Sequence, residues 1–293
     1  MKILSPINLS FEFFPPKTQE GVLNLHHAAQ DLSTYQPKFL SVTFGAGGST
    51  RNGTIDTVNL LQKTKCIVAP HLSCIGSEPD DIQEILAQYK ILGVQRIIAL
   101  RGDLPSGMGQ AGSMRYASEL VEFIRKTTGS YFHIDVAAYP EIHPQAKSAN
   151  DDVLNLKRKI EAGANSAITQ YFFNADAYFH YIDECAKVGI HAPITPGIMP
   201  ITQFNRLSRF SDICGAEIPR WISQRLESYS DDVASIKAFG LEVVTNLCER
   251  LLGGGAPGLH FYTLNKAVAT EAILGNLGVI QEEKRKLKSI SIS

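Results

Sequence analysis

The sequence lacks several features that would assign it to a specialised class. It has no apolar stretch long enough to cross a bilayer, and residues 1–6 are too short for a signal peptide. With 28 basic and 29 acidic residues, the formal net charge is -1. Such a balance offers no basic surface to nucleic acid or to an anionic membrane. We therefore expect a cytoplasmic protein whose partners include neither nucleic acid nor a membrane.

Cysteine is also scarce, and metal-binding spacings are missing. The five cysteines are scattered and form no C-x-x-C pair, and the eight histidines form no H-E-x-x-H pattern. A disulfide framework and a metal site are therefore not expected. The cysteines fit small core positions better; they are Cys66, Cys74, Cys185, Cys214 and Cys248.

What the chain does have is a regular alternation of short apolar runs and longer amphipathic runs. It holds 293 residues, 44% of them hydrophobic, which is ample for a full core. The short runs predict strands at 9–13, 39–44, 66–72, 96–100, 133–138, 166–172, 194–198 and 258–262. The amphipathic runs predict helices at 18–35, 51–64, 79–91, 115–127, 150–162, 175–188, 202–212, 218–250 and 265–276.

Eight strand–helix units favour an α/β fold of one type, a closed (β/α)8 TIM barrel. A doubly wound sheet is the alternative, but no G-x-G-x-x-G turn follows a strand. No linker or repeat interrupts the pattern, so we expect residues 1–293 to form a single domain. The charged run at 281–288 is expected to be a solvated tail.

One carboxylate stands inside the first predicted strand. Glu12 lies among Phe11, Phe13 and Phe14, and two prolines then stop the strand. A buried carboxylate must be paired, hydrogen-bonded or held protonated. Two interpretations follow: Glu12 is a proton donor with a raised pKa, or it is an ion-pair partner at the barrel mouth.

Polar or glycine-rich residues end almost every predicted strand. In a barrel of this kind, the carboxyl ends of the strands meet on one rim, where catalytic groups lie. Their convergence predicts a site at that rim. The residues are Glu12, Thr43, His71, Arg101, Tyr139, Glu141, His143, Gln170, Met199 and Tyr262, with the glycines of 45–48.

Three further patterns each allow two interpretations. Arg101-Gly102-Asp103 at a strand end suits anion binding or a self-satisfied ion pair. Asn155, Arg158 and Lys159, spaced by three and four, suit a pyrophosphate grip or an exposed helix face. Phe210 suits stacking on a planar ring or a core position.

Taken together, the segments resemble the methylenetetrahydrofolate reductase family in its bacterial, single-domain form. The resemblance runs from about Ser10 to about Gly278, and its order and spacing make it specific. The segments are FEFFPP (11–16), SVTFG (41–45), APHL (69–72), ALRGDLP (99–105), AYPEIHP (138–144), LNLKRK (154–159), ITQYF (168–172) and HFYTLN (260–265).

The resemblance implies one catalytic barrel that binds FAD and reduces 5,10-methylenetetrahydrofolate to 5-methyltetrahydrofolate with NADH or NADPH. It implies that FAD is held by Thr43, His71, Arg101, Gly102, Asp103, Tyr116, Ala117, Tyr139, His143, Asp152, Asn155, Arg158 and Lys159. It places the substrates against Glu12, Asp103, Gln170, Arg206, Phe210, Tyr262 and Lys266. Arg206 stands where some members carry Gln, and Lys266 where some carry Arg, so the bidentate fork is lost there.

The implied chemistry is ping-pong hydride transfer through FAD, in one-carbon metabolism and methionine biosynthesis. Folate must open its five-membered ring to an iminium before it accepts hydride, and Glu12 is the candidate donor of the proton this needs. The apolar neighbours of Glu12 are expected to raise its pKa if it is buried. Asp103 is expected to stay ionised and to stabilise the cation.

Three other functions compete with this one. A flavin barrel resembling proline dehydrogenase has no need of the acid at Glu12, and a pterin-binding module without redox chemistry binds no flavin. An aldolase-type barrel needs a Schiff-base lysine at a strand end, which the sequence does not show. Family resemblance also leads us to expect a homo-oligomer.

Overall fold

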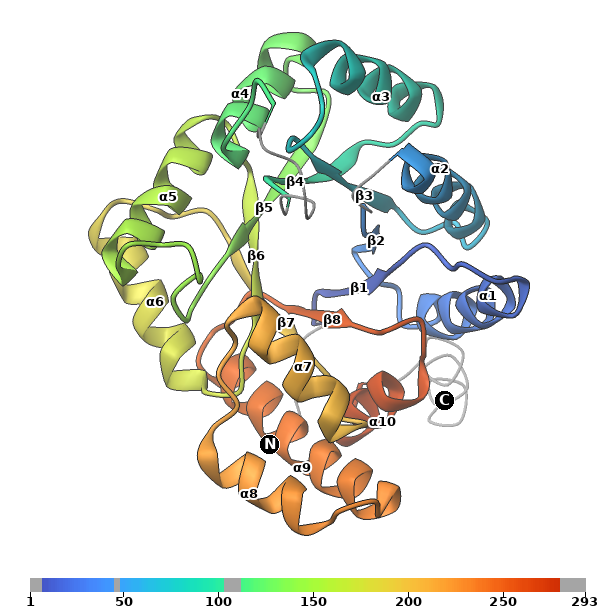
Figure 1. Cartoon of the computed structure of the whole chain (residues 1–293), viewed down its shortest axis with the longest axis vertical. Helices are drawn as coiled ribbons and strands as arrows, with labels where there is room; N and C mark the ends of the chain where they lie inside the picture. The colour runs from blue at the N-terminus through green and yellow to red at the C-terminus, as the bar shows by residue number, and fades with distance from the viewer. Residues whose placement is uncertain (1–6, 45–47, 103–111, 280–293) are drawn as a thin grey trace, which may run out of the picture.

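The computed structural model describes residues 7–44, 48–102 and 112–279. Its eight strands form a closed barrel in which each strand pairs in parallel with the next and β8 pairs with β1. Figure 1 looks along this barrel. The strands are β1 (Leu9–Phe13), β2 (Phe39–Val42), β3 (Val68–Ser73), β4 (Arg96–Leu100), β5 (His133–Ala138), β6 (Ser166–Tyr171), β7 (Ile194–Ile198) and β8 (Leu259–Tyr262). The predicted (β/α)8 barrel is confirmed.

Helices surround the barrel and cover its outer face (Figure 1). They are α1 (Gln19–Ser33), α2 (Gly48–Gln62), α3 (Pro79–Ile91), α4 (Ala117–Thr128), α5 (Ala149–Glu161), α6 (Ala175–Lys187), α7 (Phe204–Cys214), α8 (Arg220–Ser228), α9 (Val233–Gly253) and α10 (Val268–Asn276). Among the described residues, no helix is both long and apolar enough to span a membrane. The charged run at 281–288 lies outside the described residues.

The connection from β7 to β8 differs from the prediction. The sequence predicts one helix over 218–250, whereas the structure has two helices, α8 and α9. Ser230 breaks the run with a φ of 47°. Asp232 then caps α9, because its Oδ1 accepts hydrogen bonds from the Ala234 and Ser235 amides at 3.1 Å. A turn residue and an N-cap therefore outweigh the continuous amphipathic pattern.

Two compartments share the buried apolar residues. Most lie between the strands and the helices, where β1 contributes Leu9, Phe11 and Phe13. A small separate cluster fills the barrel interior with Phe39, Ala69, Ile98 and Ile168. Barrel interiors are usually dominated by branched aliphatic residues. Here the other side chains that point into the barrel are largely polar. They form a lower group at the amino-terminal ends of the strands and an upper group at the carboxyl ends.

The lower group lies at the amino-terminal ends of the strands. Arg96 donates two hydrogen bonds to the buried Asp135 carboxylate, at 2.7 and 2.8 Å. The Ser166 hydroxyl donates to the same carboxylate at 2.6 Å and lies 2.8 Å from His133 Nε2. The Arg96 guanidinium also lies 4.0 Å from the centre of the Phe39 ring. The members of the group satisfy one another's hydrogen bonds, as is typical of a structural network.

Candidate active site

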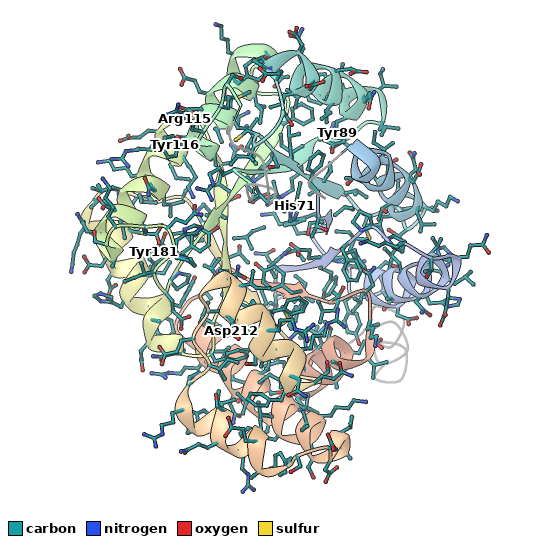
Figure 2. The ribbon with its side chains drawn as sticks, in the orientation of Figure 1. His71, Tyr89, Arg115, Tyr116, Tyr181 and Asp212 are labelled. Carbon is teal, nitrogen blue, oxygen red and sulfur yellow. The ribbon has the colours of Figure 1, made fainter. Side chains whose placement is uncertain are left out.

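The upper group is centred on Glu12, near the end of β1. The carboxylate oxygen Oε2 lies 3.3 Å from Nε2 of His71 on β3 and 3.5 Å from Nε2 of His260 on β8. The Glu12 side chain is 17% exposed, and His260 is fully buried. Figure 2 places His71 at the middle of the barrel. Three strands far apart in the sequence thus bring a carboxylate and two imidazoles together.

His260 is a site residue that the sequence reasoning missed. It pairs with Ser10 across β8 and β1, and its Nδ1 lies 2.8 Å from the Ser10 hydroxyl. That contact fixes the imidazole ring so that Nε2 faces Glu12. A signal was present, because His260 and Tyr262 are two residues apart and so point to the same side of a strand.

The pKa of Glu12 moves in the direction opposite to the sequence-based expectation. Burial raises the pKa, but the His71 and His260 imidazoles outweigh burial and lower it from 4.5 to about 2. The phenylalanines next to Glu12 in sequence face the outer core, with Phe11 and Phe13 fully buried there. The expectation of a raised pKa is therefore wrong. Glu12 lies within ion-pairing distance of two imidazoles, and its role as a proton donor stays a prediction.

Several buried polar atoms around Glu12 have no hydrogen-bond partner among the described residues. They are Ser41 Oγ and the Nε2 atoms of His71 and His260, whose contacts with Glu12 fall outside hydrogen-bond geometry. Ser41 pairs with Glu12 across β1 and β2. Native proteins rarely leave buried polar groups unpaired, so a cluster of them marks a place completed by a bound polar group.

A second cluster forms where β5 leads into α5. The Asp152 carboxylate accepts a hydrogen bond from the His143 amide at 2.7 Å, and burial raises the pKa of Asp152. The Tyr139 and His143 rings meet edge to face at 4.5 Å. The structure therefore brings these three predicted cofactor residues together.

The same cluster includes the predicted cations of α5. Lys159 Nζ donates to the Ala137 carbonyl at 2.5 Å, and burial lowers the pKa of Lys159 to about 8, with Asp152 opposing the shift. Arg158 is exposed and donates to Asn155 Oδ1 at 2.6 Å. Lys159 is thus a half-buried, anchored amine and Arg158 a solvent-facing guanidinium on one helix.

The ends of β2 and β4 carry the next predicted residues. Thr43 follows β2, and its amide donates to the Phe13 carbonyl at 2.9 Å. The Arg101 carbonyl accepts from the Ser73 hydroxyl at 2.8 Å. Gly102 has a φ of 86°, and a Cβ there would lie 1.9 Å from Ser73 Oγ, so no side chain fits. Asp103, the second predicted catalytic residue, lies outside the described residues.

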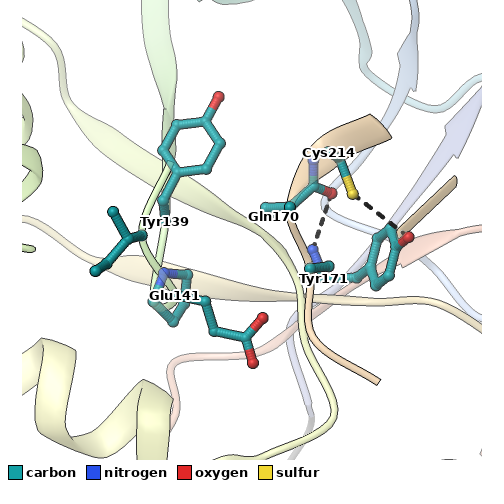
Figure 3. Close-up of a pocket in the computed structure, with 9 residues that line it drawn as sticks. Tyr139, Glu141, Gln170, Tyr171 and Cys214 are labelled. Atoms are coloured by element: carbon teal, nitrogen blue, oxygen red, sulfur yellow. Dashed lines mark hydrogen bonds between the residues drawn. The ribbon is translucent and has the colours of Figure 1, made fainter. Parts of the chain in front are cut away.

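The predicted substrate residues lie around the rim. The Tyr262 hydroxyl donates to the Thr169 carbonyl at 2.7 Å, while Gln170 Oε1 accepts from the Tyr171 amide at 3.0 Å (Figure 3). On α7, the Arg206 guanidinium lies 5.4 Å from the centre of the Phe210 ring. Lys266 is exposed.

Two predicted cofactor residues lie farther out. Tyr116 is 60% exposed at the start of α4, where its amide donates to Glu119 at 3.0 Å. Ala117 is the first residue of that helix. Figure 2 shows Tyr116 at the outer part of the ring, away from His71. The structure thus does not bring these two residues to the central cluster.

Fold and site together define a class. A parallel barrel with a carboxylate–imidazole cluster at the carboxyl ends of its strands, and with Arg158 and Lys159 on the helix beside it, has the architecture of a barrel enzyme. The sequence profile described as methylenetetrahydrofolate reductase matches residues 4–278. The chain belongs to the methylenetetrahydrofolate reductase family.

Individual relatives agree with this assignment. The chain is 42% identical over 279 residues to 5,10-methylenetetrahydrofolate reductase of Escherichia coli strain K12, covering 95% of this chain and 93% of that protein. It is 41% identical to the Buchnera aphidicola protein of the same name, covering 94% of each chain. With a probable methylenetetrahydrofolate reductase (NADH) of rice it shares 38% identity, over 94% of this chain and 49% of the rice protein.

A solved structure shares the fold. It is an uncharacterised protein from Clostridium thermocellum described as binding two copies of 5-methyl-5,6,7,8-tetrahydrofolic acid. The TM-score is 0.67 at 18% identity, with 92% of this chain and 93% of that one covered. At this identity the likeness supports the barrel architecture alone.

Proposed function

We propose that this chain reduces 5,10-methylenetetrahydrofolate to 5-methyltetrahydrofolate with NADH or NADPH, using bound FAD. The observation that carries the proposal is the carboxylate of Glu12, placed at the barrel mouth with two imidazoles around it. Family membership supports the reaction, which belongs to one-carbon metabolism and methionine biosynthesis in the cytoplasm. The proposal also includes the homo-oligomer, which sedimentation can measure.

The described residues fit FAD. A flavin dinucleotide needs cations for its pyrophosphate and polar groups for its ring edge, and α5 offers Arg158, Lys159 and the Asn155 amide. The buried Nε2 of His71 lies 3.3 Å from the Glu12 carboxylate without completing a hydrogen bond, so it would also meet a polar ring atom of the cofactor. When bound, FAD would take a hydride from the nicotinamide and give it to the folate.

The residues of the β5–α5 cluster would hold FAD and position it. Lys159 is half-buried, with its amine anchored on the Ala137 carbonyl, so its charge is fixed in place. An anionic group nearby would stabilise that charge, because burial alone disfavours it. We infer that cofactor binding and the charged state of Lys159 support each other.

Glu12 would supply the proton that opens the folate ring. The leaving nitrogen must be protonated as the iminium forms, and Glu12 is the carboxyl group at the centre of the described site. Because the resting carboxylate is ionised, the proton has to come from a neighbour. His71 and His260 lie 3.3 and 3.5 Å away, one transfer from the carboxylate. We propose that they pass a proton to Glu12 once substrate covers the mouth.

Other residues would recognise the substrates. Gln170, Tyr262 and Lys266 would contact folate, and the Lys266 amine would pair with a carboxylate of its tail. Phe210, with Arg206 beside it on α7, would stack on folate or on nicotinamide. Asp103 would stabilise the cation as an ionised carboxylate. Because folate and nicotinamide would bind in turn on the same face of the flavin, we expect ping-pong kinetics.

The visible spectrum of the purified protein tests the proposal. We expect a flavin band that bleaches when NADH or NADPH is added without oxygen, and that returns on adding methylenetetrahydrofolate. The nicotinamide that bleaches faster is the preferred one. A protein without flavin that also fails to bind added FAD would contradict the proposal and favour a pterin-binding module. Bleaching without recovery by folate would favour a different flavin barrel.

A further inference from the structure

The end of α7 meets the loop after β5, although these segments are far apart in the sequence. The Glu141 carboxylate accepts a hydrogen bond from the Glu217 amide at 2.7 Å, just beyond α7. Glu141 is half-buried, and burial raises its pKa. A partly buried carboxylate with a specific backbone partner is a directed contact rather than a casual surface one.

The backbone itself comes close at this joint. Gly215 ends α7 with a φ of 74°, and a Cβ there would lie 2.7 Å from Cγ of Pro144. The structure therefore needs glycine both for the left-handed turn and for the approach of the loop. Neighbouring Ala216 is buried. Together these residues make the joint a close packing of two chain segments.

The last turn of α7 also contacts β6. Tyr171 places its hydroxyl 3.0 Å from the Ser211 hydroxyl, and Cys214 Sγ lies 3.4 Å from the same Tyr171 oxygen. Figure 3 shows Glu141, Tyr171 and Cys214 around the seam between loop, strand and helix. The cavity left between them is about 10 Å³, no more than one water can fill. The seam is thus a joint and not a ligand pocket.

This joint connects the two halves of the proposed site. On one side, the loop carries Tyr139 and His143 of the cofactor cluster. On the other side, α7 carries Phe210, which is proposed to stack on the substrates. Whatever fixes the end of α7 to the loop therefore fixes the spacing between the cofactor side and the substrate side.

We propose that Glu141 is a positioning residue that fastens α7 to the loop after β5, so that Phe210 keeps its place relative to Tyr139. The inference rests on the proposed function for its kinetic consequences, but the fastening itself does not. Loss of the contact lets α7 sample positions unsuited to stacking. Substrate binding then weakens. The chemical steps in the bound complex change much less, because the groups that transfer protons and hydride are unchanged.

Two substitutions at one position separate the hydrogen bond from the charge. Glu141→Leu removes the acceptor, whereas Glu141→Gln keeps a carbonyl oxygen for the Glu217 amide. We expect Glu141→Leu to raise KM for both substrates about tenfold, the loss of about one charge-assisted hydrogen bond, with kcat changed much less. Glu141→Gln should stay within about threefold of the unmodified enzyme because the acceptor remains. Glu217→Gln is the matched control: it removes the Glu217 charge, which helps raise the pKa of Glu141, but it keeps the backbone amide that donates to Glu141, so KM should stay near that of the unmodified enzyme.

Hydrogen–deuterium exchange of the flavin-loaded protein gives a readout independent of activity. In Glu141→Leu, the backbone amides of both 139–144 and 204–217 should exchange faster. In Glu141→Gln, neither segment should change. If Glu141→Leu does not fold, Ser211→Ala loosens the same end of α7 from Tyr171 and should quicken exchange in 139–144 as well. Unchanged exchange and KM in Glu141→Leu, or equal damage in Glu141→Gln, would overturn the proposal. If the unmodified protein reduces no folate, the proposed function fails while the exchange data still decide the fastening.

Discussion

The two ends of the barrel interior are built from similar residue types but are satisfied to different degrees. At the lower end, Arg96, Asp135 and Ser166 are joined by hydrogen bonds of 2.6–2.8 Å. At the upper end, two imidazole nitrogens lie 3.3 and 3.5 Å from the Glu12 carboxylate and complete no hydrogen bond with it. Phe39 lies between the two groups, with Arg96 over its ring and His260 stacked on it at 5.8 Å.

This difference distinguishes a group that stabilises the fold, at the lower end, from a group that is available to a ligand, at the upper end. A polar network that satisfies its own members holds the fold and has nothing left to offer a ligand. The upper group keeps buried polar atoms without a hydrogen bond at the carboxyl ends of the strands, where barrel enzymes hold their chemistry. We therefore expect changes at the upper end to alter catalysis, and changes at the lower end to alter stability.

The largest effect is expected from Glu12→Gln at the upper end. Loss of the proton donor should lower folate turnover at least about 100-fold, because general acid catalysis contributes about that much. Flavin content and the rate of flavin reduction by the nicotinamide should remain near normal, as stopped-flow absorbance can measure. Glu20→Gln, on the exposed first turn of α1, serves as the control. Near-normal folate turnover in Glu12→Gln would remove this residue from the mechanism.

At the lower end, Asp135→Asn is expected to act on stability. It leaves the buried Arg96 without its counter-charge, which should lower the free energy of unfolding by about 3 kcal/mol in urea titrations. The matched control is Asp176→Asn, whose partner Arg250 is at the surface, and it should cost under about 1 kcal/mol. A variant of normal stability with impaired folate turnover would reverse the proposed division of labour.

The pH dependence of stability gives the next effect. Because the pKa of Glu12 is lowered to about 2 in the folded protein, its ionised form stabilises the fold above about pH 4.5. That contribution is lost as pH falls from 4.5 towards 2, and it amounts to at most about 3 kcal/mol. The difference in unfolding free energy between the unmodified protein and Glu12→Gln should therefore shrink over that window. A difference that stays constant down to pH 2 would contradict the lowered pKa.

The smallest effect is expected beside the barrel, at Lys159. Replacing this half-buried amine by Met removes a partly desolvated charge, so the apoprotein should be as stable as before or more so. FAD affinity should fall about tenfold, the loss of one charge-assisted contact, as fluorescence titration can measure. Lys157→Met, on the same helix with an exposed partner in Glu161, is the control. Equal FAD affinity in both variants would place Lys159 outside the cofactor site.

The architecture can be predicted from the sequence because the local spacing of apolar residues distinguishes strands from helices. The bounds of β1, β4, β5 and β7 agree with the prediction residue for residue. Glu12 was found as well, since one acid in an apolar strand is a local anomaly. The division of α8 from α9 was missed, because it depends on one residue with positive φ.

The environment of Glu12 could not be predicted in the same way. The local sequence shows phenylalanines, which pointed to a raised pKa. The barrel turns Phe11 and Phe13 outward and brings His71 and His260 to the carboxylate instead. The sign of the pKa shift thus depends on strand pairing across the barrel, which no local pattern records.

The most direct test of this account is the titration of the Glu12 carboxyl itself. Carbon-13 NMR of protein labelled at glutamate side-chain carboxyls, with Glu12→Gln to assign the signal, reports its protonation against pH. We expect a carboxylate that is ionised at neutral pH and titrates well below 4.5. A signal that titrates above 4.5 would contradict it, and would mean that Glu12 stores its own proton without the two histidines.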